Sequence, residues 1–396
     1  MVHCRVESDA RPRPAWAGWL LLALLLSLSA ACARQREGGP IGEFAIAPDG
    51  DGYILRYRQD KESRLVSYSA RSGIVRALPQ PANEHWASPV FSPDGKWIAV
   101  AVCDVDEQRL VNHTTARIDI MRPDGSGRRT VVPADGRVTG PFTFSPDGGR
   151  ILFSKGHARE TRRPVDFDIY ESDLASGRAS VVVPGKFYQL SSVAYLGQQY
   201  AYVGDGPRNY LGDYQPPPRE YNAHADEQQK MKWEMASNSM LYISSTQPQE
   251  LAPAVRFQAN GGTLLAWSQV REIERLRVAP ENRRMFVAMR HPDHPPGKRF
   301  THFTRDVFEM EGEGTFRRLT WFNTVQFQGF DVTPDGRYVA VVPTPGGYAG
   351  TRPGEIYRIE SATGAVTVHV PNFSNILSPD EADKSVAGAA KRGAQR

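Results

Sequence analysis

The chain has 396 residues, of which 40% are hydrophobic and 10% aromatic; this composition can form a sizeable core and excludes a globally disordered protein. Its 35 glycines and 30 prolines are typical of an all-β protein with many short strands and turns. The formal net charge of +4 is too small for nucleic-acid binding by bulk charge.

The N-terminal segment has the pattern of an export signal. Arg5, Arg11 and Arg13 precede an apolar run over residues 15–28, which is too short to span a bilayer comfortably. Small residues follow this run, so we expect a cleaved secretory signal. Cleavage would remove three arginines and two acidic residues and would leave a net charge of +3.

The end of this segment, Leu28-Ser29-Ala30-Ala31-Cys32, resembles a bacterial lipobox. The resemblance implies a lipoprotein signal peptide over 1–31, a lipidated Cys32 and a tether within 32–40. Several acyl chains on one residue make membrane attachment stable. Alanine follows the cysteine where aspartate would mark inner-membrane retention, which predicts a lipid-anchored protein on the periplasmic face of the outer membrane in a Gram-negative cell. The alternative is an ordinary signal peptide cut near the same position.

From residue 41 onward the sequence repeats one unit. The stretch FSPDGKWIAV occupies residues 91–100, and its copies begin at Ile46, Phe144, Val193, Val278 and Val332. Each full copy combines an apolar strand end, a Pro-Asp-Gly turn and an alternating strand. A unit repeated in this way cannot bury its apolar face alone, so it must stack with its copies.

The Pro-Asp-Gly segment itself is interpreted as a turn. In Ser92-Pro93-Asp94-Gly95, proline presets the backbone dihedral, aspartate accepts hydrogen bonds from local amides, and glycine adopts a positive φ. We therefore expect the repeat aspartates to form turns and not to act as paired catalytic acids; they are Asp49, Asp94, Asp147 and Asp335.

A second hairpin follows each turn hairpin, as in ARIDIMRPDGSGRRTVV from Ala116. Four alternating strands per repeat are typical of a propeller blade. The interval from Leu196 to Pro280 is 84 residues, and it becomes 48 when an insertion of 36 residues at 204–239 is removed. The sequence thus predicts an all-β fold, a six-bladed β-propeller of four-stranded antiparallel blades. An additional hairpin pattern from Val255 leaves seven blades as the alternative.

These repeats resemble those of TolB-type WD-like β-propellers, which include periplasmic TolB, the propellers of prolyl-oligopeptidase relatives and some polysaccharide lyases. The resemblance covers residues 41–370, and the polar tail over 371–396 is expected to be disordered. It implies a membrane-anchored cell-envelope lipoprotein that binds and does not catalyse. The expected partner is an envelope protein, such as a peptidoglycan-associated lipoprotein, or an anionic ligand.

In a propeller, the turns inside each hairpin lie on one face, which we call the turn face. The connections between hairpins and between blades lie on the opposite face, which we call the loop face. The long connections of this sequence, including 102–116 and 154–166, belong to the loop face, where binding sites are built from loops on a rigid scaffold. Their basic and aromatic residues predict a site for an anionic glycan, an acidic protein surface or a phosphate headgroup. The candidate ligand-binding residues are Lys155, His157, Arg159, Arg162, Arg163, Tyr214, Trp233, Lys298, Arg299 and His302.

Four residues of one connection are candidate metal ligands: His291, Asp293, His294 and His302. Their side chains suit zinc or manganese, but their spacing matches no strong template, and solvated loop histidines are the other interpretation. A metal here would favour the alternative function, a lyase or hydrolase acting on acidic saccharides. The sequence contains no nucleophile elbow, phosphate-binding loop or haem-attachment motif, so we expect no catalytic residues and no cofactor.

Overall fold

The structure is a computed structural model. It describes residues 40–59, 62–159, 162–207, 240–245, 258–259, 263–264, 273–291, 304–311, 315–344 and 351–379. All of these belong to one compact unit, Gly39–Arg396. The predicted signal peptide, Cys32 and residues up to 39 lie outside the described part of the chain, as do residues 208–239 of the predicted insertion.

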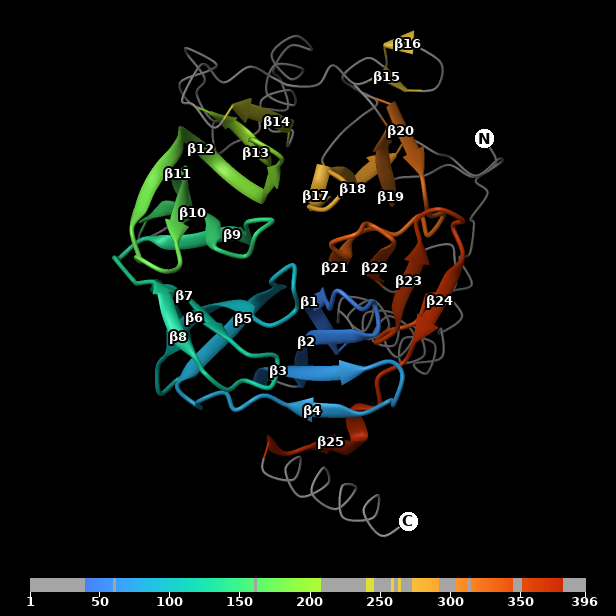
Figure 1. Ribbon diagram of the computed structural model, residues 1–396. Coiled ribbons are helices and arrows are strands. Elements are labelled where there is room, and N and C mark those ends of the chain that lie inside the picture. Colours follow the sequence, from blue (N-terminus) through green and yellow to red (C-terminus); the bar gives the residue numbers. More distant parts are fainter. Residues whose placement is uncertain are drawn as a thin grey trace, which may run out of the picture. The chain divides into compact units, whose positions relative to one another are not determined.

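The described strands form five sheets of four to six strands around a common axis (Figure 1). The first sheet contains β1 (Ile41–Ile46), β2 (Gly52–Gln59), β3 (Glu62–Ser69), β4 (Val75–Ala77) and the C-terminal β25 (Ile376–Leu377). The second contains β5 (Glu84–Phe91), β6 (Ile98–Val105), β7 (Val111–Met121) and β8 (Arg129–Val132).

The third sheet has six strands: β9 (Val138–Phe144), β10 (Arg150–Arg159), β11 (Arg162–Asp173), β12 (Ala179–Leu196), β13 (Gln199–Pro207) and β14 (Met240–Ser245). The fourth contains β17 (Ile273–Ala279), β18 (Arg284–His291), β19 (Thr304–Glu311) and β20 (Thr315–Arg318). The fifth contains β21 (Phe327–Val332), β22 (Tyr338–Pro343), β23 (Ile356–Glu360) and β24 (Val366–His369). A separate two-stranded hairpin, β15 (Gln258–Ala259) and β16 (Thr263–Leu264), forms from the additional hairpin pattern near Val255.

The third sheet is wider than the others because β12 pairs with two partners along its length. From Ala179 to Phe187 it pairs with β11, and from Phe187 to Leu196 it pairs with β13. The hydrogen-bonded ladder therefore runs unbroken from β9 to β14. Counted as continuous sheets, the described residues form five propeller blades, whereas the sequence predicts six or seven. The all-β propeller itself is confirmed.

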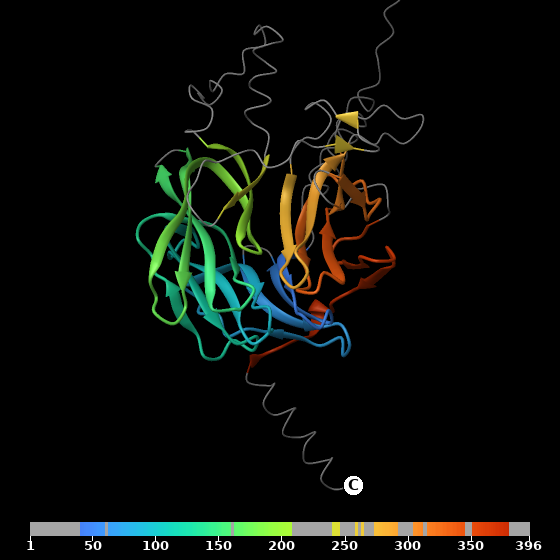
Figure 2. The same cartoon turned by 45° about the horizontal axis from the view of Figure 1, so that its top comes forward.

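Hydrophobic cores fill the spaces between neighbouring sheets. Ile54 and Trp86 pack between the first and second sheets, and Phe44 and Ile356 pack between the first and the last. Both views show the first sheet, in blue, beside the last, in red (Figures 1 and 2). Side-chain burial between sheets thus closes the ring, as expected for a unit that cannot bury its face alone.

The predicted repeat turns are confirmed. Gly95 has a φ of 70°, in the left-handed region that a side chain disfavours. Asp94 Oδ1 accepts from the backbone amide of Lys96 at 3.1 Å. The Ser92 hydroxyl accepts from the amide of Trp97 at 3.0 Å and so fastens the turn to the next strand. Turn aspartates accept local backbone amides in the other repeats as well, at Asp49, Asp147 and Asp335.

Two connections that the sequence predicts as long loops are mostly strand. Only residues 106–110 separate β6 from β7, and only 160–161 separate β10 from β11. In the pairing of β10 with β11, Lys155 lies opposite Asp168, and Arg159 lies opposite Arg162. The loop expectation is wrong here because these strand extensions are largely polar. They lack the apolar alternation by which strands are recognised in a sequence.

The end of the described chain fastens to the first sheet. After β24, a short 3-10 helix, η1 (Phe373–Asn375), leads to β25, which pairs in parallel with β4. The Phe373 ring stacks on Tyr57 with 4.5 Å between ring centroids. These residues belong to the segment from 371 onward that the sequence assigns to the tail. No helix in the described part of the chain is long and apolar enough to cross a membrane.

Candidate functional site

Six strands line the axis of the ring: β1, β5, β9, β12, β17 and β21. Two cavities follow each other along these strands. In every strand, the residues that line the wider cavity come first, and each strand then runs into its hairpin turn. The wider cavity, of ≈ 400 Å³, therefore lies toward the loop face, and we call it the loop-end cavity. The narrower one, of ≈ 60 Å³, lies toward the turn face, and we call it the turn-end cavity.

Polar side chains make up much of the wall of the loop-end cavity. Its charged residues are Glu43, Glu274, Arg275 and Arg277. Its amide and hydroxyl residues are Gln189, Gln326, Gln328, Ser88, Thr139 and Ser191. A cavity of this size with converging polar groups is a common form of binding site for small molecules.

Glu43 is held as a carboxylate in this wall. Its Oε2 accepts hydrogen bonds from the Ser88 amide at 2.9 Å and the Ser88 hydroxyl at 2.8 Å, and Arg56 Nη1 lies 3.8 Å away. Burial by itself would raise the pKa of Glu43, but Arg275, Arg56 and the Ser88 hydrogen bonds outweigh it and hold the pKa below its ordinary value. Ser88 has a φ of 51° within a bulge of β5, and this uncommon conformation aims both donors at Glu43.

Arg275 is the cation of this wall that lacks a partner. Its guanidinium makes no hydrogen bond or ion pair with any residue that the structure describes. Its charge nevertheless contributes to the lowered pKa of Glu43. By contrast, Glu274 Oε2 lies 3.2 Å from Arg305 Nε. Arg275 therefore leaves donor groups available in a partly enclosed space.

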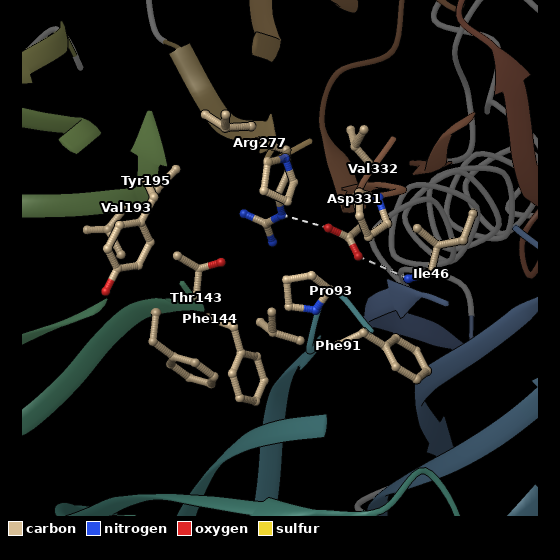
Figure 3. A pocket seen from close by; sticks show the side chains of 16 residues that line it. Ile46, Phe91, Pro93, Thr143, Phe144, Val193, Tyr195, Arg277, Asp331 and Val332 are labelled. Atoms are coloured by element: carbon tan, nitrogen blue, oxygen red, sulfur yellow. Dashed lines mark hydrogen bonds and ion pairs between the residues drawn. The ribbon is translucent and has the colours of Figure 1, made fainter. Parts of the chain in front are cut away.

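An ion pair lies where the two cavities meet. Arg277 Nε donates to Asp331 Oδ1 at 2.9 Å, and the Ile46 amide donates to Asp331 Oδ2 at 3.0 Å (Figure 3). Burial raises the pKa of Asp331, while Arg277 and the Ile46 amide oppose that rise. The contacts join β17, β21 and β1, and Arg277 lines both cavities. Arg277 thus lies where the loop-end cavity narrows into the turn-end cavity.

Repeat prolines surround the turn-end cavity. Pro93, Pro280 and Pro334 line it, together with apolar residues of the strand ends such as Val193 and Phe144. The cavity is too small for an organic ligand of ordinary size. The turn-face end of the axis is therefore mainly structural.

On the loop face, a buried carboxylate fixes the connection between β20 and β21. Asp306 is fully buried and accepts from the Thr320 hydroxyl at 2.8 Å and from Arg318 Nη2 at 2.6 Å. Trp321 follows Thr320 directly and is 64% exposed, with Arg318 5.4 Å from its ring centroid. The same connection leads to Gln326 in the wall of the loop-end cavity. An exposed indole thus sits on a well-anchored segment that reaches the cavity wall.

The structure describes two of the predicted ligand-binding side chains. Lys155 is buried, and its ammonium group already contacts the Pro133 carbonyl at 2.9 Å and Asp135 Oδ1 at 3.0 Å. His157 is exposed near the tip of the β10–β11 hairpin. The backbones of Arg159, Arg162 and Arg163 lie in the same hairpin. The other candidates lie outside the described residues: Tyr214, Trp233, Lys298, Arg299 and His302.

The candidate metal ligands are not brought together within the described residues. His291 ends β18, with its backbone opposite Thr304. Asp293, His294 and His302 lie outside the described part of the chain. Among the residues that the structure does describe, no three histidine, cysteine or acidic side chains are grouped closely enough to hold a metal ion.

Sequence reasoning did not identify the residues on the axis. Glu43, Arg275 and Asp331 each occupy one position of an inner strand, and no motif marks them. One available signal was a charged residue inside a mostly apolar strand close to a repeat turn, as Asp331 is in FQGFDV. Such a charge needs a partner when it is buried.

No protein-family model matches the sequence, and no curated protein matches it. The structural neighbours of this chain include TolB proteins. TolB from Acinetobacter baumannii has a TM-score of 0.49 and 13% identity, over 85% of this chain and 64% of that one. A putative TolB from Agrobacterium tumefaciens has a TM-score of 0.47 and 14% identity, over 77% of this chain and 91% of that one.

An oligogalacturonate lyase in complex with manganese has a TM-score of 0.49 and 9% identity, over 82% of this chain and 75% of that one. The chain spans less than two thirds of the length of the first TolB structure. At identities this low and TM-scores below 0.5, these likenesses carry no conclusion about the role of this chain. TolB proteins are among its structural neighbours, as the repeats predict.

Proposed function

We propose that this protein is a lipid-anchored β-propeller of the cell envelope, whose loop face binds an envelope protein. Cys32 would carry the anchor and place the propeller on the periplasmic face of the outer membrane. The observation that carries the binding role is Trp321, an exposed indole on a segment anchored by the buried Asp306. The proposed role is binding, without catalysis.

The exposure of Trp321 supports a protein partner. Tryptophan is enriched among the residues that dominate the energy of protein interfaces. A side chain on an already ordered segment loses little conformational entropy when it binds. Other exposed apolar side chains occur on connections of the same face, Leu110 at 66% and Val325 at 51% exposure. The predicted basic residues near the tip of the β10–β11 hairpin would meet an acidic part of the partner.

We propose six blades for the ring. The two pairing partners of β12 support this count, because the strand would then serve as the outer strand of one blade and the inner strand of the next. The six strands that line the axis fit the same count. An experimental structure with five or seven inner strands would contradict it.

A photo-reactive amino acid at Val325, on the loop face, tests the docking surface in intact membranes. The same amino acid at Ile74, which is 39% exposed on the turn face, serves as the control. We expect a defined protein adduct from position 325 only. Trp321→Ala should reduce that adduct by about tenfold or more, since hot-spot truncations cost about 2 kcal/mol or more. Equal adducts from both positions, or an adduct unaffected by Trp321→Ala, would sink the proposal.

The anchor has a separate test. Cys32→Ala should abolish acyl labelling and release the exported protein into the soluble fraction, because no acylated residue would remain. Unchanged labelling and membrane retention would show that Cys32 is not the anchor. Cleavage of uronate oligomers in the presence of Mn²⁺ by the purified protein would favour the alternative lyase function.

A further inference from the structure

We propose that the loop-end cavity binds the carboxylate of one small polar molecule, with Arg275 as the group that holds the carboxylate. This inference does not depend on the protein partner proposed above. It rests on the balance of charge in the cavity, on polar groups in its wall that lack partners, and on the narrowing of the axis beyond Arg277.

The charge balance singles out Arg275. Among the charged residues of the wall, Arg277 is paired with Asp331 and Glu274 with Arg305. Glu43 is hydrogen-bonded to Ser88 and lies at ion-pair distance from Arg56, and the charge of Arg275 acts on it without such a contact. Within the described residues, Arg275 is therefore the cation of the wall that stands without an ion pair. One anionic group would neutralise the remaining positive charge of Arg275.

The chemistry of Arg275 favours a carboxylate. A guanidinium carries five N–H donors in a planar fork, which matches the two oxygens of a carboxylate. Donors that remain unpaired in a partly enclosed site cost free energy that a ligand can recover. Because the described part of the cavity wall has a single cation without an ion pair, a group with one negative charge fits better than one with two.

Two further wall residues indicate that the ligand is polar beyond its carboxylate. Thr139 Oγ1 and Gln328 Oε1 are buried, and neither has a hydrogen-bond partner. Both residues line the loop-end cavity. Buried polar atoms are nearly always hydrogen-bonded in native proteins, so these two need partners from outside the chain. Hydroxyl or amide groups of a ligand could provide them after small side-chain rotations.

The narrowing of the axis limits the size of the ligand. Arg277 lines both cavities, and the space on its turn-face side is only ≈ 60 Å³. The ≈ 400 Å³ on its loop-face side falls in the range of small-ligand pockets and suits a sugar acid or a dipeptide.

Isothermal titration with the full-length lipoprotein in detergent micelles tests the proposal. The probes are two matched pairs, glucuronate against methyl glucoside and N-acetyl-dialanine against its amide. We expect at least one acid to bind at millimolar concentration or tighter, with its neutral counterpart at least tenfold weaker. The pair that binds identifies the source of the carboxylate as a sugar acid or a peptide end.

Variants assign the binding to Arg275. Arg275→Gln should weaken the acid by about tenfold or more, and Arg275→Lys should retain part of the affinity. Arg178→Gln removes the same charge from an exposed position on a turn of the turn face and should bind as the parent protein does. Circular dichroism and thermal unfolding establish that each variant is folded.

The proposal is overturned if neither acid binds, if the neutral probes bind as well as the acids, or if Arg275→Gln leaves the affinity unchanged. Each of these results can occur while the loop-face adduct at Val325 still forms. The converse also holds, so the failure of one proposal is distinguishable from the failure of the other.

Discussion

The two ends of the axis are built from the same six strands, yet they differ in what holds them. At the turn-face end, the repeat motif closes each hairpin through bonds within a few residues, as between Asp94 and Lys96. At the loop-face end, the contacts join distant parts of the chain, as between Glu43 and Ser88. The turn-face end leaves a small cavity lined by prolines, and the loop-face end leaves a larger polar one.

This difference between local and long-range contacts indicates which end of the scaffold can vary. A turn whose backbone groups are hydrogen-bonded within the turn does not depend on particular neighbouring residues, so the same turn can recur in every repeat of the ring. Charged residues on inner strands, such as Glu43 and Asp331, are satisfied by particular partners on neighbouring inner strands. Function therefore has more room at the loop-face end, where Arg275 has no ion pair among the described residues.

The largest expected effect comes from removing Asp331, which joins three neighbouring inner strands. Asp331→Ala removes the partner of the Arg277 guanidinium and of the Ile46 amide. Loss of one partner from a buried ion pair costs about 3–5 kcal/mol of the free energy of unfolding. Urea denaturation followed by tryptophan fluorescence measures the change.

The matched control is Asp335→Ala, four residues further along the chain in the repeat turn. Asp335 accepts from the Thr333 hydroxyl and the Arg337 amide at the protein surface, so its loss should cost only about 1 kcal/mol. Equal destabilisation by the two variants would contradict the distinction between an end held by local hydrogen bonds and an end held by contacts between distant parts of the chain.

A smaller effect concerns pH. His85 is near the loop-face end of β5, and its Nε2 lies 3.2 Å from Arg56 Nη2. Burial, then the charges of Arg56, His113 and Arg58, lowers the pKa of His85 to about 4, although Glu43 opposes this shift. The unfolded chain therefore takes up this proton first, at a pKa near 6.5, and the free energy of unfolding decreases as pH falls from 6.5 to about 4.

His85→Gln should flatten the stability profile in this pH window, because it removes the titrating group while leaving an acceptor for Arg56. The turn aspartates respond in another window. Burial raises the pKa values of Asp94 and Asp147, but hydrogen bonds outweigh it and hold both below 3.8, so their contribution is lost only at more acidic pH. Denaturation series of the parent and His85→Gln proteins at several pH values check this. An unchanged slope between pH 6.5 and 4 would contradict the role of His85.

Part of the candidate site was accessible to prediction. The loop face follows from the order of strands in a propeller repeat, and Trp321 lies on a connection of that face. The axis residues were not predicted, because each occupies one place in a different strand and no spacing links them. The connections after β6 and β10 were also misjudged, because strand extensions that are largely polar carry no apolar alternation.

The sequence by itself determined the repeat, its turns and the all-β propeller. The reason is physical: a Ser-Pro-Asp-Gly turn and an alternating strand are specified within about ten residues by dihedral preference and local hydrogen bonds. Only the tertiary structure decided which residues meet on the axis. The Ile46 amide and Asp331 are 285 residues apart in the chain, and their contact exists because packing between the first and last sheets closes the ring.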